Sequence, residues 1–142
     1  MTKDFTLYEF LLSNTANALG IRENLTPPQS VIDNLTALAT NILQPLRDEV
    51  GRIKINSGYR CPRLNAAVKG AKNSQHLTGE AADIEGIDIS NAELFEAIKR
   101  IKLPFDQLIW EFGTRSNPSW VHVSFSPRNR RQILYIPKNL QK

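Results

Sequence analysis

The chain has 142 residues, of which 41% are hydrophobic and 23% are charged, and its net charge is +4 at neutral pH. This length and composition predict one globular domain with a substantial core and exclude a chain that is disordered throughout. The single cysteine, Cys61, excludes an internal disulfide and a cysteine-rich metal site, so a metal ion would need nitrogen and oxygen ligands.

The positive charge gathers late in the sequence, at Arg128, Arg130, Arg131, Lys138 and Lys142. This distribution fits either a solvated surface or attraction to an anionic polymer such as nucleic acid or cell wall. The segment has little aromatic interleaving and matches no nucleic-acid module, so we expect no nucleic-acid partner.

Helices are predicted in the first third of the chain. Residues 5–20 carry apolar side chains at helical spacing and end at Gly20, which predicts one or two short helices. Residues 26–51 repeat apolar residues every three or four positions, which predicts the longest helix, with Thr26 as its N-cap. Pro45 lies inside this helix and is expected to bend or break it.

Strands dominate the rest of the chain. Alternation predicts a strand at RIKINS, and a short helix follows from Pro62 to Gly70. AADIEG is predicted as a strand, and Ser90 with Glu93 forms a capping box at the start of a helix that ends by Pro104. FDQLIWEF and WVHVSF are predicted as a hairpin, and ILYIP as an edge strand. These elements indicate an α+β fold with a mainly antiparallel sheet and helices packed on it.

The only two histidines lie in unusual settings. His76 precedes a turn of small residues around Gly79 that can bring Asp83 near the imidazole. His122 lies within the apolar run WVHVSF, where a histidine costs desolvation unless it has a partner. Two neutral imidazoles and one carboxylate suit tetrahedral Zn²⁺, with a fourth position open to water. Such a site predicts hydrolytic chemistry.

The segment from Ser74 to Asp83 resembles a known signature. Ser74, His76, Gly79, Ala81 and Asp83 fit the pattern S-x-H-x-x-G-x-A-x-D of the zinc D-Ala-D-Ala carboxypeptidase and L-alanyl-D-glutamate endopeptidase superfamily, to which the hedgehog signalling domain is related. The stretch SGYR with the following Leu-Asn, and the strand WVHVSF, are similar to further elements of that superfamily, so the resemblance covers roughly residues 53–125. The amino-terminal helices resemble those of its small, often phage-encoded branch.

The resemblance implies a role for each matching residue. His76, Asp83 and His122 would bind one Zn²⁺ per chain, and Arg60 would bind substrate and stabilise the developing oxyanion. The same resemblance suggests that Ser57, Tyr59 and Ser74 contact the substrate. For Ser57 and Tyr59, the geometry and packing of their loop are at least as good an explanation.

The chain departs from the family pattern at the general base. Several relatives carry an acid three residues before the last histidine, and others a histidine two residues before it, but this chain has Ser119 and Trp120 there. Glu111 is our candidate base, because a hairpin between FDQLIWEF and WVHVSF would bring it beside His122 if both side chains share a face. An exposed glutamate at a strand end is the alternative.

These observations predict a single zinc peptidase domain over residues 1–142, with a helical front half (1–52), a metal-site core (53–127) and a basic carboxyl-terminal segment (128–142). The expected activity is hydrolysis of D-amino-acid-containing peptide bonds in bacterial peptidoglycan, as a D,D-carboxypeptidase or an L-Ala-D-Glu endopeptidase. The alternative is a non-catalytic zinc module that recognises cell-wall peptide or a protein.

The amino-terminal residues and the distribution of apolar residues predict where the protein is made. MTKDFTLYEF lacks the apolar core of a secretory signal, and no stretch approaches the about 20 apolar residues of a membrane span. We therefore expect a monomer that is made in the cytoplasm, that of the host if a phage encodes it, and acts at the cell wall after release, as a phage lysis enzyme does.

Overall fold

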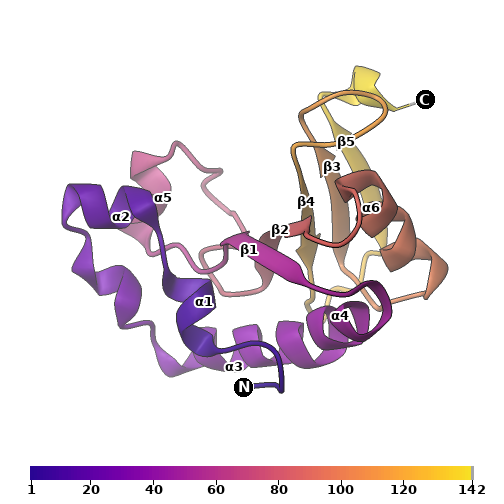
Figure 1. Ribbon diagram of the computed structural model, residues 1–142. Helices are drawn as coiled ribbons and strands as arrows, with labels where there is room; N and C mark the ends of the chain where they lie inside the picture. The colour runs from indigo at the N-terminus through magenta and orange to yellow at the C-terminus, as the bar shows by residue number, and fades with distance from the viewer. Residues whose placement is uncertain (142) are drawn as a thin grey trace.

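The computed structural model describes residues 1–141, and its strands form one five-stranded sheet in the order β1-β2-β4-β3-β5 (Figure 1). Neighbouring strands are antiparallel except β3 and β5, which are parallel. The predicted α+β fold with a mainly antiparallel sheet is therefore confirmed. The strands are β1 Ile53–Ser57, β2 Ala81–Gly86, β3 Gln107–Glu111, β4 Trp120–Ser124 and β5 Gln132–Ile136.

The helices begin and end close to the predicted positions. Ser90 and Glu93 form the predicted capping box, and Gly20 ends the second helix in the left-handed conformation. None of the helices within residues 1–141 is both long and apolar enough to cross a membrane. The helical elements are α1 Leu7–Leu11, α2 Asn14–Leu19, η1 Arg22–Leu25, α3 Gln29–Leu38, η2 Ala39–Leu43, α4 Gln44–Val50, α5 Pro62–Ala67, α6 Asn91–Arg100 and η3 Lys138–Leu140.

The long helix differs from the prediction at its start and is irregular, but continuous, at Pro45. Thr26 is not its N-cap: the Thr26 hydroxyl donates to the carbonyl of Glu23 within η1, and Pro28 occupies the N-cap position. Pro45 does not break the helix. The preceding turn, η2, is a π-helix, and this wider turn accommodates the missing proline N–H between α3 and α4.

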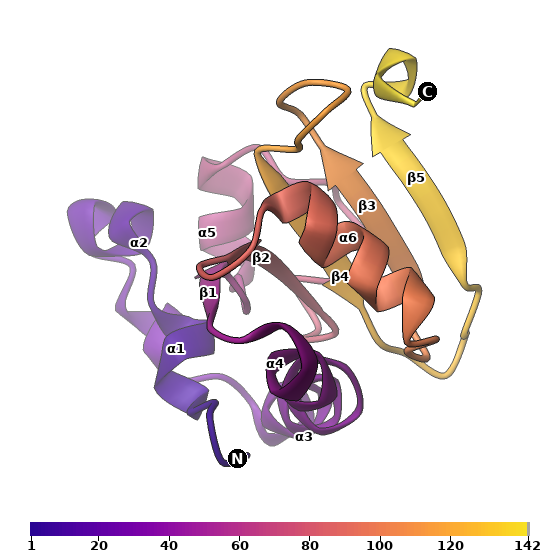
Figure 2. The same ribbon diagram turned by 45° about the vertical axis from the view of Figure 1, so that its right-hand side comes forward.

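The sheet presents two different faces. Leu108, Trp110, Val121 and Val123 point into the hydrophobic core on the face that α6 covers (Figure 2). Alternation sends the residues between them to the opposite face, which carries polar and acidic side chains. The helical front half packs below and beside this sheet in Figure 2. The strand residues that line the cleft described next alternate with these core residues, so the cleft lies on the face away from α6.

Candidate metal centre

Three side chains converge on the open face of the sheet. Asp83 of β2 and His122 of β4 are directly opposite each other across the antiparallel pair, and Asp83 Oδ1 lies 3.0 Å from His122 Nδ1. His76 approaches from the loop before β2 and places Nε2 at 3.4 Å from Asp83 Oδ1. One ligand atom from each of these three residues lies within 4.8 Å of the others.

The backbone fixes the ring of His76. Its Nδ1 lies 2.7 Å from the carbonyl oxygen of Gly58. A carbonyl can only accept, so Nδ1 carries the proton and the lone pair of Nε2 is directed toward Asp83. This is the arrangement by which proteins orient a metal-binding imidazole. Gly58 itself is tightly enclosed, since a Cβ there would lie 2.6 Å from the Phe10 carbonyl oxygen.

The turn between His76 and Asp83 requires glycine. Gly79 adopts a φ of +77°, and a Cβ at this position would lie 2.7 Å from the carbonyl oxygen of Val31 in α3. The small residue therefore lets the loop return into β2 while packed against the long helix. The sequence predicted this turn but not its close contact with α3.

The donor set fits a zinc ion. Burial raises the pKa of Asp83, but its electrostatic interactions with His76 and His122 outweigh that effect and hold the pKa well below its usual range. Asp83 is therefore an ionised carboxylate. Tetrahedral zinc holds ligands at about 2.0–2.1 Å, which separates ligand atoms by about 3.4 Å. The observed separations of 3.0 and 3.4 Å are close to that value.

Glu111 lies beside this centre. It ends β3, and its Oε1 is 3.6 Å from His122 Nδ1, on the strand that pairs with β3 in the hairpin. Burial and the negative charge of Asp83 raise the pKa of Glu111, while His122, the nearby Trp120 indole and the charge of Arg60 oppose that rise. The raised pKa identifies a carboxyl group that gains a proton more readily than an exposed glutamate.

Arg60 and Ser74 form part of the same cleft wall. The Arg60 guanidinium donates to Ser74 Oγ at 3.2 Å, and the Arg60 backbone N–H donates to the carbonyl of His76. Burial lowers the pKa of Arg60, and the charges of Asp83 and Glu111 counteract this. Both residues line a cleft of about 690 Å³ together with the three converging side chains.

Two predicted contact residues lie outside this cleft. Ser57 and Tyr59 border an adjoining hollow of about 290 Å³, which shares Arg60 and Asp83 with the cleft. Tyr59 is buried in the core, and burial raises the pKa of its hydroxyl. Cys61 and Trp110 are likewise core residues, whereas Trp120 lines the cleft and its ring contacts that of Phe112 edge to face.

The sequence alone did not identify several residues that build the cleft. Asp106, which the sequence places only at the start of a strand, is fully buried and accepts hydrogen bonds from Gln75, Ser126 and Arg130. Arg128 and Arg130 line the cleft beside Gln107, although the sequence reads them as part of a basic tail. The sequence shows these residues as a basic run, but only the tertiary fold brings them near the metal centre.

Comparison with known proteins agrees with this geometry. The family model described as Peptidase M15 matches residues 3–124, which include all the residues of the metal centre. No curated protein matches the chain.

Proposed function

Because this chain belongs to the Peptidase M15 family, a family of metallopeptidases, we propose that it is a zinc-dependent hydrolase of D-amino-acid-containing peptide bonds in bacterial peptidoglycan. The observation that carries the proposal is the convergence of His76, Asp83 and His122 in an open cleft with Glu111 beside them. The proposed bond is one that a D,D-carboxypeptidase or an L-Ala-D-Glu endopeptidase cleaves.

His76 Nε2, Asp83 Oδ1 and His122 Nδ1 would hold the ion. When bound, zinc supplies Lewis acidity that polarises a carbonyl and makes nearby water more acidic. Glu111 is positioned to take a proton from the attacking water and return it to the leaving amine. The Arg60 guanidinium faces the same cleft, where its fixed positive charge stabilises negative charge on the carbonyl oxygen.

Glu111 lies next to the position at which several relatives carry an acid. Ser119 stands where several relatives of the resembled superfamily carry an acid, and its backbone N–H donates to the carbonyl of Glu111 at 3.0 Å. Glu111 therefore approaches the same metal centre from β3 rather than from the β4 side. A carboxylate therefore lies near His122, although it comes from β3.

Mass spectrometry of muropeptides tests the proposal. Purified peptidoglycan is incubated with the zinc-loaded protein, with the chelator-treated protein and with chelator-treated protein to which zinc has been restored. We expect released peptides in the first and third reactions only, and their masses identify the bond. The absence of any released peptide in all three reactions would favour the non-catalytic zinc module, for which the serine at position 119 is the main argument.

The biological setting is also part of the proposal. We infer that the enzyme is a lysis enzyme of the phage type, made in the host cytoplasm and acting on the wall after release. The similarity of the front helices to the small phage-encoded branch supports this setting. We expect the protein to clear a bacterial lawn or purified walls when it is added from outside. Expression inside cells, without release, should not lyse them.

A further inference from the structure

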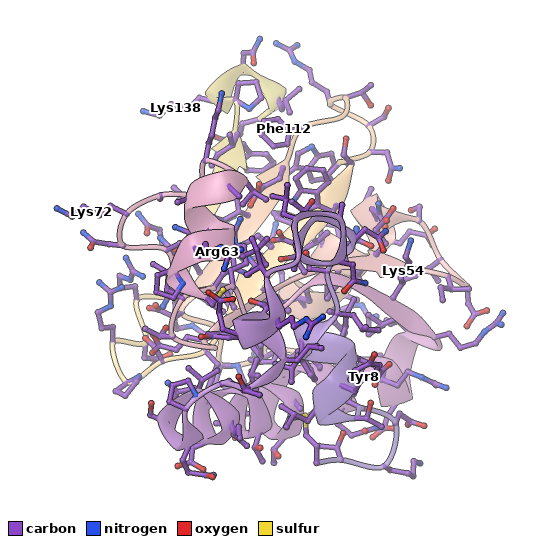
Figure 3. The ribbon with its side chains drawn as sticks, turned by 90° about the vertical axis from the view of Figure 1, so that its left-hand side faces the viewer. Tyr8, Lys54, Arg63, Lys72, Phe112 and Lys138 are labelled. Carbon is purple, nitrogen blue, oxygen red and sulfur yellow. The ribbon has the colours of Figure 1, made fainter. Side chains whose placement is uncertain are left out.

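The two ends of the cleft differ in chemistry. Phe112 and Trp120 lie at one end, beside Glu111, and Figure 3 shows Phe112 near the same end of the molecule as Lys138. Arg128 and Arg130 lie at the other end, beside Gln107. A peptide lying along β3 would therefore meet aromatic rings on one side of the metal centre and positive charge on the other.

The register of the sheet gives the position of the cationic end. Gln107, Ile109 and Glu111 alternate onto the cleft face of β3, and Ile109 is paired with His122. Gln107 is two residues earlier, about 7 Å along the strand, which is the length of about two residues of an extended peptide. Gln107 donates from its side chain to Gln132 Oε1, so this part of the floor is polar.

Arg130 is held firmly at this end. Its backbone N–H, Nε and Nη2 donate to the carboxylate of Asp106 at 2.7, 3.0 and 2.8 Å. Asp106 is inaccessible to solvent, and Gln75 and Ser126 complete its hydrogen bonding. Within residues 1–141, Nη1 of Arg130 has no acceptor, and the side chain is 33% exposed. One edge of an anchored guanidinium thus remains available to a ligand.

The surrounding loop is shaped to present these arginines. Asn129 and Arg131, on either side of Arg130, both have positive φ, which costs free energy for residues with a side chain. The hydrogen bonds to Asp106 stabilise that backbone. Arg128 makes no ion pair within residues 1–141, and its backbone N–H is fixed by Ser126 Oγ at 3.2 Å.

The charge of the cleft favours an anion. Four cationic side chains line it against two carboxylates, and both carboxylates belong to the metal centre: Arg60, Lys69, Arg128 and Arg130 against Asp83 and Glu111. The buried carboxylate of Asp106 offsets the charge of Arg130, which leaves one positive charge in excess, and this excess increases when a divalent ion binds. An anionic ligand is therefore attracted to the end of the cleft away from Asp83 and Glu111, where Arg128 has no ion pair within residues 1–141.

We propose that Arg128 and Arg130 form a carboxylate-binding subsite that makes the enzyme select acidic peptides, with the bound carboxylate placed about two residues from the scissile bond. This inference rests on the proposed function, because it assumes that the cleft binds a wall peptide. The planar fork of arginine matches the two oxygens of a carboxylate. A wall stem peptide offers such groups on its D-glutamyl residue and at its carboxyl terminus.

Binding measurements separate these two carboxylates. Three synthetic stem peptides are compared: both groups free, only the D-glutamyl group amidated, and only the terminal group amidated. The zinc-loaded Glu111→Gln chain serves as the receptor so that turnover is suppressed, and calorimetry gives each Kd. We expect amidation of the carboxylate held by the subsite to weaken binding about tenfold.

Substitutions then assign that preference to the subsite. In the Glu111→Gln chain, the further change Arg128→Gln should reduce the effect of amidation on Kd to less than about twofold. Arg130→Lys keeps the positive charge but should also reduce this effect. Arg131→Gln is the matched control, because its guanidinium stacks 5.2 Å from the Phe105 ring and does not line the cleft. It should leave the tenfold preference unchanged. A circular dichroism melt of each variant checks folding.

Several outcomes would overturn the subsite: equal binding of all three peptides, no binding of any peptide, a preference that survives Arg128→Gln, or one that Arg131→Gln also removes. Muropeptide release tests the proposed function independently. Release without a carboxylate preference would leave the hydrolase and remove the subsite. A preference that depends on Arg128, in a protein that releases no peptide, would keep the subsite and remove the hydrolase.

Discussion

At the scale of single residues, the centre depends on contacts that the sequence partly predicts. The pairing of His76 with Asp83 across a small-residue turn, and of Glu111 with His122 across a hairpin, follows from spacing and strand alternation. The hydrogen bond from His76 to Gly58 does not, because the two residues come from separate loops. Spacing can bring side chains near one another, but the tautomer of a ring depends on its tertiary partner.

Replacing Glu111 tests the proposed base. Glu111→Gln keeps the size of the side chain but removes the group that accepts the proton, so kcat should fall by about 10²–10⁴-fold. Zinc content, measured by atomic absorption, should be unchanged because Glu111 is not one of the three converging ligands. Glu96→Gln, on the exposed surface of α6, is the control and should retain full activity. Activity that survives Glu111→Gln would assign the base elsewhere.

Two glycines allow the cost of the turn to be separated from its packing. Gly20 and Gly79 both have positive φ, but an added Cβ has nothing within 4 Å at Gly20 and lies 2.7 Å from a backbone oxygen at Gly79. Gly20→Ala should cost about 1 kcal/mol of unfolding free energy. Gly79→Ala should cost about 3 kcal/mol, since overpacking adds to the backbone strain. Urea unfolding measures both, and equal losses would contradict the close contact with α3.

At the scale of elements, sequence patterns located the strands and most helix ends but not all their relationships. Alternation and turn residues predicted the β3–β4 hairpin and the edge position of β5. They gave no indication that β5 pairs in parallel with β3, because the loop after β4 crosses back before β5 begins. Asp106 fixes that crossing by accepting the backbone N–H of Arg130. A buried carboxylate of this kind is indistinguishable in sequence from a polar residue at a strand start.

Acid unfolding tests Asp106 as the joint between these elements. Hydrogen bonds from Arg130 are the largest cause of its lowered pKa, with Gln75 and Ser126 adding to the effect against burial. A lowered folded-state pKa means that the stabilisation is complete above about pH 5 and is lost as pH falls toward the folded value. Asp106→Asn should cost about 3 kcal/mol at pH 7 and flatten the fall in stability below pH 4.

The exposed pair of Asp88 and Arg52 provides the comparison. The pKa of Asp88 is also lowered, to about 2, chiefly by a hydrogen bond from Arg52. Because solvent screens this pair, Asp88→Asn should change stability much less than Asp106→Asn. Denaturant unfolding from pH 2 to pH 7 measures both variants. Similar losses for the two would contradict a structural role for the buried carboxylate.

At the scale of the whole molecule, the sheet separates stability from chemistry. One face packs on α6 and the hydrophobic core, and the other carries the metal centre and the cleft. The sequence revealed this division through alternation within each strand, and the motif from Ser74 to Asp83 indicated the metal chemistry. The composition of the cleft walls depended on loops that meet only in the folded chain, so those walls could not be predicted.

Metal binding should therefore stabilise the whole fold. The ligands come from β2, β4 and the loop before β2, which an unfolded chain does not hold together. Free zinc at about 100 times its Kd should add about 2.7 kcal/mol, which raises the Tm by about 5–10 °C. Differential scanning calorimetry with zinc and with chelator measures this shift. His122→Ala should abolish it, and a Tm that ignores zinc in the unaltered chain would contradict the site.

The direct opposition of Asp83 and His122 ties the proposed metal centre to a single strand alignment. If β4 slipped by one position, a valine would face the cleft and the imidazole of His122 would enter the hydrophobic core. The metal centre and the packing of the core would then be lost together. Molecules with β4 misaligned would therefore lack the metal centre and be less stable. Length changes in this protein should be tolerated in the connector from Phe112 to Ser119 and rejected inside either strand, a boundary that insertion scanning can map.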